Sequence, residues 1–164
     1  MMNIVVLGLG NLLLSDEGVG VRVVEALARR APPLPDCVTL LDGGTAAMDL
    51  LDELCAADHL IVADAINAET PGELITLRDG ELGAFFQTKI SPHQVGFADV
   101  LAAMTLLDGA PQSIVVHGVA PLSLETGMAL TPLIAGKVET LCQRIVKEIN
   151  TLLIDARQAQ AESV

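Results

Sequence analysis

The 164-residue chain has no tryptophan and no tyrosine, and its aromatic content is limited to three phenylalanines. Bases and sugars are commonly bound by stacking on such side chains, so the sequence offers little material for that kind of site. Cationic residues are also scarce. The chain has nine Lys and Arg but 21 Asp and Glu, which gives a formal net charge of −12. A basic stripe that could neutralise phosphate is missing, which argues against binding to nucleic acid or to anionic lipid.

Long hydrophobic runs are missing too. Asn11, Asp16 and Asp64 interrupt the apolar stretches well short of the roughly 18 residues that a membrane helix needs. The three cysteines form no CxxC pair, which argues against a disulfide framework or a zinc knuckle. No Lys or Arg precedes Arg22, so the basic region of a signal peptide is absent. These absences predict a cytoplasmic protein with no membrane partner.

What the chain does have is apolar material in a regular order: 51% of its residues are hydrophobic, enough for a sizeable core. The expected strands span 3–9, 37–41, 59–64, 73–78 and 113–119, and the expected helices span 17–30, 46–56, 92–107 and 132–154. Their alternation predicts one α/β domain over residues 1–154: a three-layer sandwich with a mostly parallel, twisted sheet of about five strands and helices on both faces. The strand at 73–78 alternates apolar and polar residues, as an edge or antiparallel strand does. The polar tail, 155–164, is expected to fray.

The glycine-rich loop after the first expected strand, from Gly8 to Gly20, begins like a dinucleotide-binding fingerprint. That motif requires a third glycine where this chain has Leu13. Asp16 and Glu17 also stand where a pyrophosphate would lie, and their charges would repel it. A nucleotide-binding oxidoreductase is therefore a weak alternative, which a thermal shift with NAD or ATP would revive.

Acidic residues at strand ends are the stronger candidates, because ligands of parallel sheets bind at the carboxyl ends of the strands. Asp42 follows the second expected strand, where an Asx-type turn with a Thr45 cap and a functional carboxylate are equally good interpretations. Asp64 ends a very apolar strand, where a carboxylate is costly unless it is paired, hydrogen-bonded or bound to a cation. At a helix start, N-capping explains one of Asp16 and Glu17 more readily than both.

His93 falls in the first turn of its expected helix, where the positive end of the helix favours a neutral imidazole. Together with Glu17 and Asp64 it forms a mixed oxygen and nitrogen ligand set that suits a borderline divalent metal. We expect these three residues along one edge of the sheet. The other two histidines are expected to be structural, because His59 precedes its strand and His117 lies inside one.

Four blocks of this sequence form a specific combination: LGLGNLLLSDEGVG (7–20), LDGGTAAMDLL (41–51), DHLIVADAI (58–66) and SPHQVGFADVLA (91–102). Together they resemble the [NiFe]-hydrogenase maturation endopeptidases of the HybD and HupD type. The stretch GVAPLSLETGMALTP (118–132) follows the same pattern, and the resemblance covers nearly all of residues 3–148. Several blocks in register are far more specific than any one motif.

The resemblance implies an endopeptidase, of an aspartic or metal-assisted type, that removes the C-terminal extension of a nickel-loaded [NiFe]-hydrogenase large-subunit precursor. It assigns the metal contacts to Glu17, Asp64 and His93, and it adds Asp42 to these three as a further catalytic residue. The implied metal is nickel supplied by the substrate as a recognition element, for which another divalent cation can substitute in crystals.

Two mechanisms remain open under this resemblance. In one, nickel polarises the scissile carbonyl or activates water. In the other, the metal contacts only check nickel loading, and Asp42 or another acid serves as general base. A non-catalytic, metal-sensing chaperone of the large subunit is the alternative function, and it would leave the precursor's length unchanged. A monomer is expected, because a protease that must enclose a large folded partner gains nothing evident from self-association.

Overall fold

The computed structural model describes residues 1–83 and 92–163, without the side chains of 92–96. Its single sheet has the strand order β2-β1-β3-β5-β4. The strands are β1 (Ile4–Leu9), β2 (Val38–Gly44), β3 (His59–Ala65), β4 (Leu74–Arg78) and β5 (Ser113–Val119). All pairings are parallel except that of β4, which lies antiparallel to β5 at one edge. The predicted α/β domain, its five strands and its antiparallel edge strand are confirmed.

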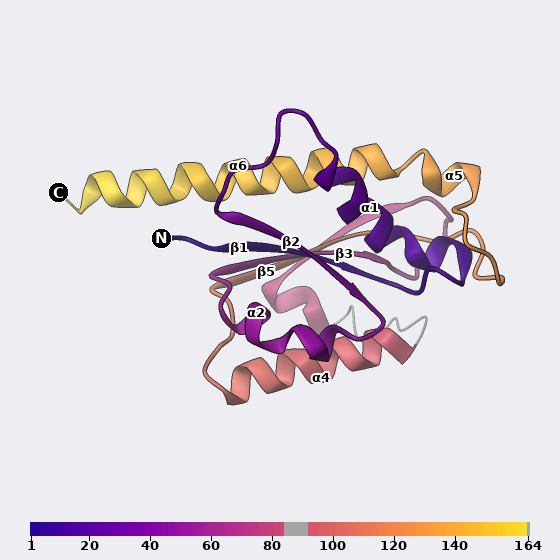
Figure 1. Ribbon diagram of the computed structural model, residues 1–164, viewed down its shortest axis with the longest axis horizontal. Helices are drawn as coiled ribbons and strands as arrows, with labels where there is room; N and C mark the ends of the chain where they lie inside the picture. Colours follow the sequence, from indigo (N-terminus) through magenta and orange to yellow (C-terminus); the bar gives the residue numbers. More distant parts are fainter. Residues whose placement is uncertain (84–91, 164) are drawn as a thin grey trace.

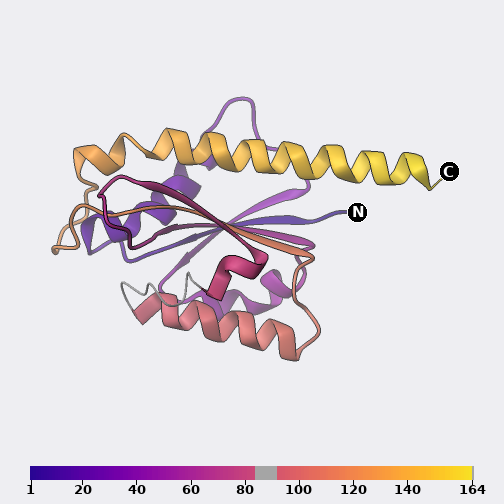
Figure 2. The same ribbon diagram turned by 180° about the vertical axis from the view of Figure 1, so that it is seen from behind.

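Helices cover both faces of this sheet (Figures 1 and 2). α1 (Val19–Ala28) and α6 (Val138–Glu162) lie on one face, and α2 (Leu51–Cys55) and α4 (Pro92–Leu106) lie on the other. The shorter helices are η1 (Ser15–Gly18), η2 (Ala47–Leu50), η3 (Asp79–Glu81) and α5 (Pro132–Ala135). In β3, Ile61 and Ala63 pack with α1 and α6, whereas Leu60 and Val62 pack with α4. Because both faces are buried, residues 60–63 of the strand are continuously apolar.

The end of β2 differs from the prediction. The strand continues to Gly44 rather than ending at Leu41, because the backbone N–H of Gly10 donates a 2.9 Å hydrogen bond to the Gly44 oxygen and prolongs the pairing with β1. The helix predicted over 46–56 is divided into η2 and α2, and Ala46 rather than Thr45 precedes it, with no side-chain cap. The predicted Thr45 cap is therefore wrong.

The last helix also extends further than predicted. α6 reaches Glu162 instead of ending near residue 154, so most of the segment expected to fray is helical. Its sequence contains neither glycine nor proline, the two residues that most strongly disfavour a helix interior. In Figure 1 its C-terminal half projects beyond the sheet. No helix in the described part of the chain is long and apolar enough to cross a membrane.

Gly20 permits the close approach that places α1 over the carboxyl ends of β1 and β3. A Cβ at this position would overlap the backbone oxygens of both Ala63 and Leu9. Gly8 repeats the constraint from the strand side, since its Cβ would lie 2.5 Å from the Gly20 oxygen. The missing side chains let α1 start directly above the sheet, which carries η1 to the carboxyl edge.

Replacing Gly20 with alanine should lower the free energy of unfolding by about 3 kcal/mol, since the added methyl group overlaps backbone atoms that cannot rotate away. Gly80→Ala is the matched control, because a Cβ at Gly80 meets nothing within 4 Å. Urea unfolding of both variants measures the difference. Equal stabilities for the two variants would contradict the proposed close packing.

Candidate functional site

The candidate residues are positioned by elements that meet at the carboxyl edge of the sheet. Asp64 is the next-to-last residue of β3, and Asp42 lies near the end of β2. Glu17 belongs to η1, and its backbone oxygen lies so close to Gly10 that a Cβ there would overlap it. His93 lies in the first turn of α4, but its side chain is outside the described residues. The meeting of Glu17, Asp64 and His93 in one cleft therefore stays a prediction.

Two of these carboxylates are enclosed by the protein. Glu17 is 1% exposed and Asp64 is 0% exposed, and η1 packs against β3. Asp64 Oδ1 accepts a 2.8 Å hydrogen bond from the backbone N–H of Ala65. A carboxylate removed from water is costly unless it is hydrogen-bonded, paired or bound to a cation. Among the side chains described, no group of three or more His, Cys, Asp and Glu could hold a metal, and the His93 imidazole is not among them.

Asp42 has a different setting from the enclosed pair. Its side chain is exposed, and Oδ1 accepts a 2.9 Å hydrogen bond from the backbone N–H of Gly44, whose φ is +47°. This geometry confirms the Asx-type turn. In the register, Asp42 pairs with Gly8, which pairs with Ala63, so the backbones of Asp42 and β3 lie about 10 Å apart.

Strand alternation separates Asp42 from Asp64 further. Leu40 and Ala63 both pack on the face covered by α1 and α6. Because side chains alternate along a strand, the Cβ of Asp42 lies on that same face, whereas the Cβ of Asp64 lies on the face that α4 covers. Asp64 therefore lies on the face that the helix of His93 covers, and Asp42 lies on the opposite face.

Asp16 accepts several hydrogen bonds at this edge. The sequence indicated only helix capping, yet neither η1 nor α1 has a side-chain cap. The fully buried carboxylate instead accepts hydrogen bonds at Oδ2 from the N–H groups of Leu122 and Ser123, both at 3.0 Å. Its Oδ1 accepts one from the N–H of Thr131 at 2.7 Å, and the Thr131 hydroxyl donates to Oδ2 at 2.9 Å. Asp16 is a tertiary anchor and not a cap.

Further hydrogen bonds continue this anchor along the chain. Ser15 donates from its N–H to the Gly127 oxygen at 2.8 Å and from its hydroxyl to the Glu125 oxygen at 2.7 Å. Gly127 N–H in turn donates to the Leu13 oxygen at 2.9 Å. Residues 13–16 are thus joined to 122–131 along their length, which fixes the backbone directly before Glu17.

Substituting Asp16 with asparagine should destabilise the protein by about 3 kcal/mol, because the amide replaces an acceptor oxygen with a donor that faces N–H groups. The exposed Asp36→Asn is the control and should change stability by less than about 0.5 kcal/mol. Urea unfolding gives the free energies, and amide hydrogen exchange should speed up over 121–131 in the Asp16 variant alone. Unchanged exchange there would show that this segment does not depend on Asp16.

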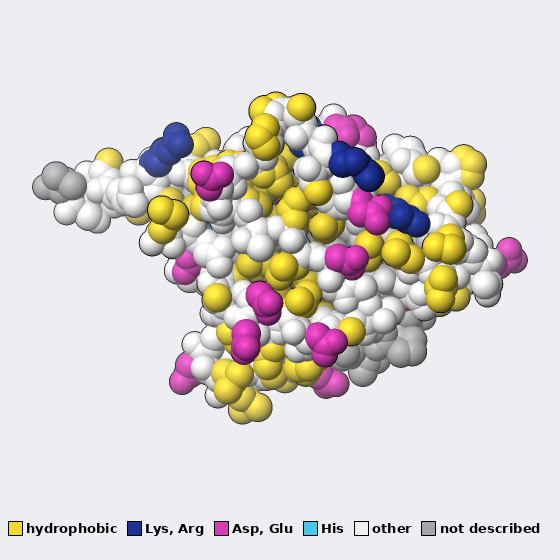
Figure 3. Space-filling view, viewed as in Figure 1, with side chains coloured by type: hydrophobic (Ala, Val, Ile, Leu, Met, Phe, Trp, Pro, Cys, Tyr) yellow, Lys and Arg dark blue, Asp and Glu magenta, His cyan; other side chains and the backbone are white. Residues whose placement is uncertain are grey.

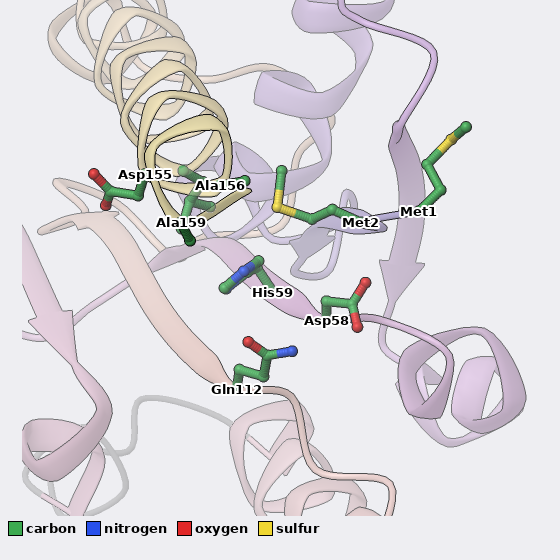
Figure 4. Close-up of a pocket in the computed structure, with 9 residues that line it drawn as sticks. Met1, Met2, Asp58, His59, Gln112, Asp155, Ala156 and Ala159 are labelled. Atoms are coloured by element: carbon green, nitrogen blue, oxygen red, sulfur yellow. The ribbon is translucent and has the colours of Figure 1, made fainter. Parts of the chain in front are cut away.

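The other histidines lie where the sequence predicted. His59 begins β3 at the opposite edge, with Nδ1 2.7 Å from the Ser113 hydroxyl. It lines a cavity of about 510 Å³ beside the C-terminal part of α6, together with Asp58 and Asp155 (Figure 4). This cavity is separate from the edge that holds Glu17 and Asp64, so it is not the candidate site.

His117 lies buried in β5, with Nδ1 3.0 Å from the Thr76 hydroxyl and Nε2 3.8 Å from Glu148 Oε2. Burial lowers its pKa to about 4, against the opposing effect of the Glu148 charge, so the ring is neutral at pH 7. Arg78 donates two hydrogen bonds to Glu148, at 2.7 and 2.9 Å, and holds the pKa of that carboxyl below its ordinary value. The group joins β4 and β5 to α6.

The pKa of His117 predicts a pH dependence of stability. A histidine in the unfolded chain binds a proton near pH 6.5, but His117 in the folded chain binds one only near pH 4. The free energy of unfolding should therefore fall as the pH drops through this window. The contribution is on the order of 3 kcal/mol. His117→Gln should flatten the slope of unfolding free energy between pH 4 and 6.5, while His59→Gln should retain it. Parallel slopes for wild type and His117→Gln would refute this origin.

This structure is an α/β domain with enclosed carboxylates where its parallel strands end, and residues 21–148 match the family model of hydrogenase maturation proteases. The chain is 45% identical to the hydrogenase 2 maturation protease of Escherichia coli K12 over 162 residues, covering 98% of each protein. It is 43% identical to the hydrogenase expression/formation protein HupD of Rhodobacter capsulatus, covering 89% of this chain and 70% of that protein. The chain belongs to the hydrogenase maturation protease family.

Solved structures agree with this assignment. The hydrogenase maturating endopeptidase HybD from Escherichia coli superposes with a TM-score of 0.86 at 47% identity, covering 92% of this chain and 93% of that one. The [NiFe] hydrogenase maturation protease HybD from Thermococcus kodakarensis gives a TM-score of 0.76 at 24% identity, over 89% of this chain and 98% of that one. The second likeness concerns the fold alone. The predicted family is confirmed, and the protein is a hydrolase that acts as a protease.

Proposed function

We propose that this protein is an endopeptidase that removes the C-terminal extension of a nickel-loaded [NiFe]-hydrogenase large-subunit precursor. The observation that carries the proposal is the enclosed pair Glu17 and Asp64, at the carboxyl edge of a domain from the hydrogenase maturation protease family. Carboxylates held there are suited to a metal-bearing substrate. Membership of the family supports the proteolysis, and the donor chemistry supports the recognition of nickel.

In this proposal the nickel is part of the substrate, and three residues of this chain contact it. Glu17 and Asp64 supply carboxylate oxygens and His93 supplies an imidazole nitrogen, a mixed set that suits a borderline divalent ion. The backbone positions are compatible with a shared site, since η1 packs against β3 and α4 covers the face to which Asp64 belongs. Nickel held in this way can polarise the scissile carbonyl or activate water.

Enclosure of the carboxylates has a consequence for substrate binding. Solvent reaches neither Glu17 nor Asp64 to any useful extent, so in this proposal a metal carried by another protein contacts them only after a local rearrangement. Precursor binding would therefore be coupled to a local opening of this edge, as in many enzymes whose closure excludes water.

Asp42 is proposed as the general base or as a contact to the substrate peptide. It is exposed, one carboxylate oxygen is oriented by Gly44, and it starts from the other face of the sheet from Asp64. That setting suits proton transfer from a water molecule better than a fourth contact to the metal. In the alternative in which Glu17, Asp64 and His93 only check nickel loading, Asp42 carries the hydrolysis.

Incubation of the protein with nickel-loaded precursor tests the function, with the substrate mass as readout. Wild type should shorten the nickel-loaded precursor and leave the nickel-free form intact. His93→Ala should melt like wild type but process on the order of 100-fold more slowly, because one contact to the reacting metal is lost. His59→Gln, at the opposite edge, should process at the wild-type rate.

Two results would count against this proposal. Processing by His93→Ala at the wild-type rate would exclude its metal contact. A wild-type protein that binds the nickel-loaded precursor without changing its mass would instead be the metal-sensing chaperone.

A further inference from the structure

Large hydrophobic side chains stand exposed beside the candidate site. Leu13, Leu122, Leu124 and Met128 are between 39% and 64% exposed, and we call these four residues the apolar rim. Figure 3 shows hydrophobic side chains gathered at the end of the molecule that holds the start of α1 and α5. Exposed apolar groups that cluster in this way commonly mark a site where another molecule binds.

The apolar rim is held in place by the hydrogen bonds around Asp16. Gly127, the residue directly before Met128, donates a hydrogen bond from its N–H to the Leu13 oxygen. Leu122 donates one from its N–H to the Asp16 carboxylate. Arg22 donates a 3.0 Å hydrogen bond to the Met128 oxygen and ties the same loop to α1. Because the backbone is fixed at each of these points, the rim is an ordered surface that loses little conformational entropy when it is covered.

Charge is nearly absent from the two segments that form the apolar rim. Residues 8–15 contain no charged side chain, and residues 121–135 contain only Glu125. The whole chain nevertheless carries 9 basic and 21 acidic residues. A charge-poor surface on so acidic a protein is matched by an apolar partner surface, since depletion of charge marks the core of protein interfaces.

The position of the apolar rim selects its occupant. Asp16, which anchors the segment of Leu122, directly precedes the candidate metal contact Glu17, so a protein that presents a metal to Glu17 comes to lie beside the rim. A second copy of this chain is the less favourable occupant, because each copy brings a net charge of −12 and the two would repel. The remaining occupant is the folded body of the protein substrate.

We propose that the apolar rim is the docking surface for the folded body of the precursor, next to the metal that Glu17 contacts. This inference rests on the proposed function. The rim touches no reacting group, so it contributes the same binding energy to the bound substrate and to the transition state. Its loss should therefore raise KM and leave kcat unchanged.

The test compares two double variants with wild type. Leu13→Ser with Met128→Ser removes two exposed side chains of the rim. Leu106→Ser with Leu107→Ser removes two other exposed leucines, at the C-terminal end of α4 and directly after it. For the rim variant, KM for nickel-loaded precursor should rise about tenfold or more. The Kd for nickel-free precursor, measured by calorimetry, should rise by a similar factor. The control should match wild type in both, and all proteins should melt alike.

The outcomes separate this inference from the proposed function. Equal KM and Kd for the rim variant and its control would overturn docking at the rim, even where wild type cleaves normally. A wild-type protein that binds precursor without cutting it would overturn the proposed endopeptidase, while the Kd values still decide on the rim. A wild-type dimer that the rim substitutions dissociate would assign the surface to a second copy and overturn the inference.

Discussion

The buried carboxylate of Asp16 is the interaction on which the carboxyl edge depends. It supplies the acceptors for the N–H groups of Leu122, Ser123 and Thr131, in a place closed to water. A buried N–H without an acceptor costs more than a hydrogen bond contributes, so losing this one side chain would leave several groups unsatisfied together. The backbone that carries Glu17 is thereby fixed to a segment more than 100 residues further along the chain.

Close contacts at two glycines position the same edge from the side of the sheet. Gly8 and Gly20 let α1 descend onto β1 and β3, and the helix start then delivers η1 to the same edge as the end of β3. Rigid elements on one side and a hydrogen-bonded loop on the other hold the enclosed carboxylates of Glu17 and Asp64. In our proposals, chemistry takes place inside this edge and recognition takes place on the charge-poor loops around it.

Much of the fold could be predicted because the interactions behind it are local or periodic. Strands buried on both faces are mostly continuous apolar runs, as β1 and residues 60–63 of β3 are, and the alternation in β4 marks its antiparallel edge position. His117 was correctly placed inside a strand for the same reason. Its lowered pKa was not predictable, since it arises from burial against α6, and the opposing charge of Glu148 also comes from a residue that is distant in sequence.

The sequence alone determined the α/β class, the approximate strand positions and the family to which the blocks of motifs belong, because each is assembled from patterns that are local to short segments. Only the tertiary structure decided that Asp16 is an anchor, that β2 reaches Gly44, and that Asp42 and Asp64 start from opposite faces. The partners of Asp16 lie 106 to 115 residues away, and β2 is prolonged by a hydrogen bond from Gly10. Such contacts leave no local pattern, since they exist only once the chain has brought distant segments together.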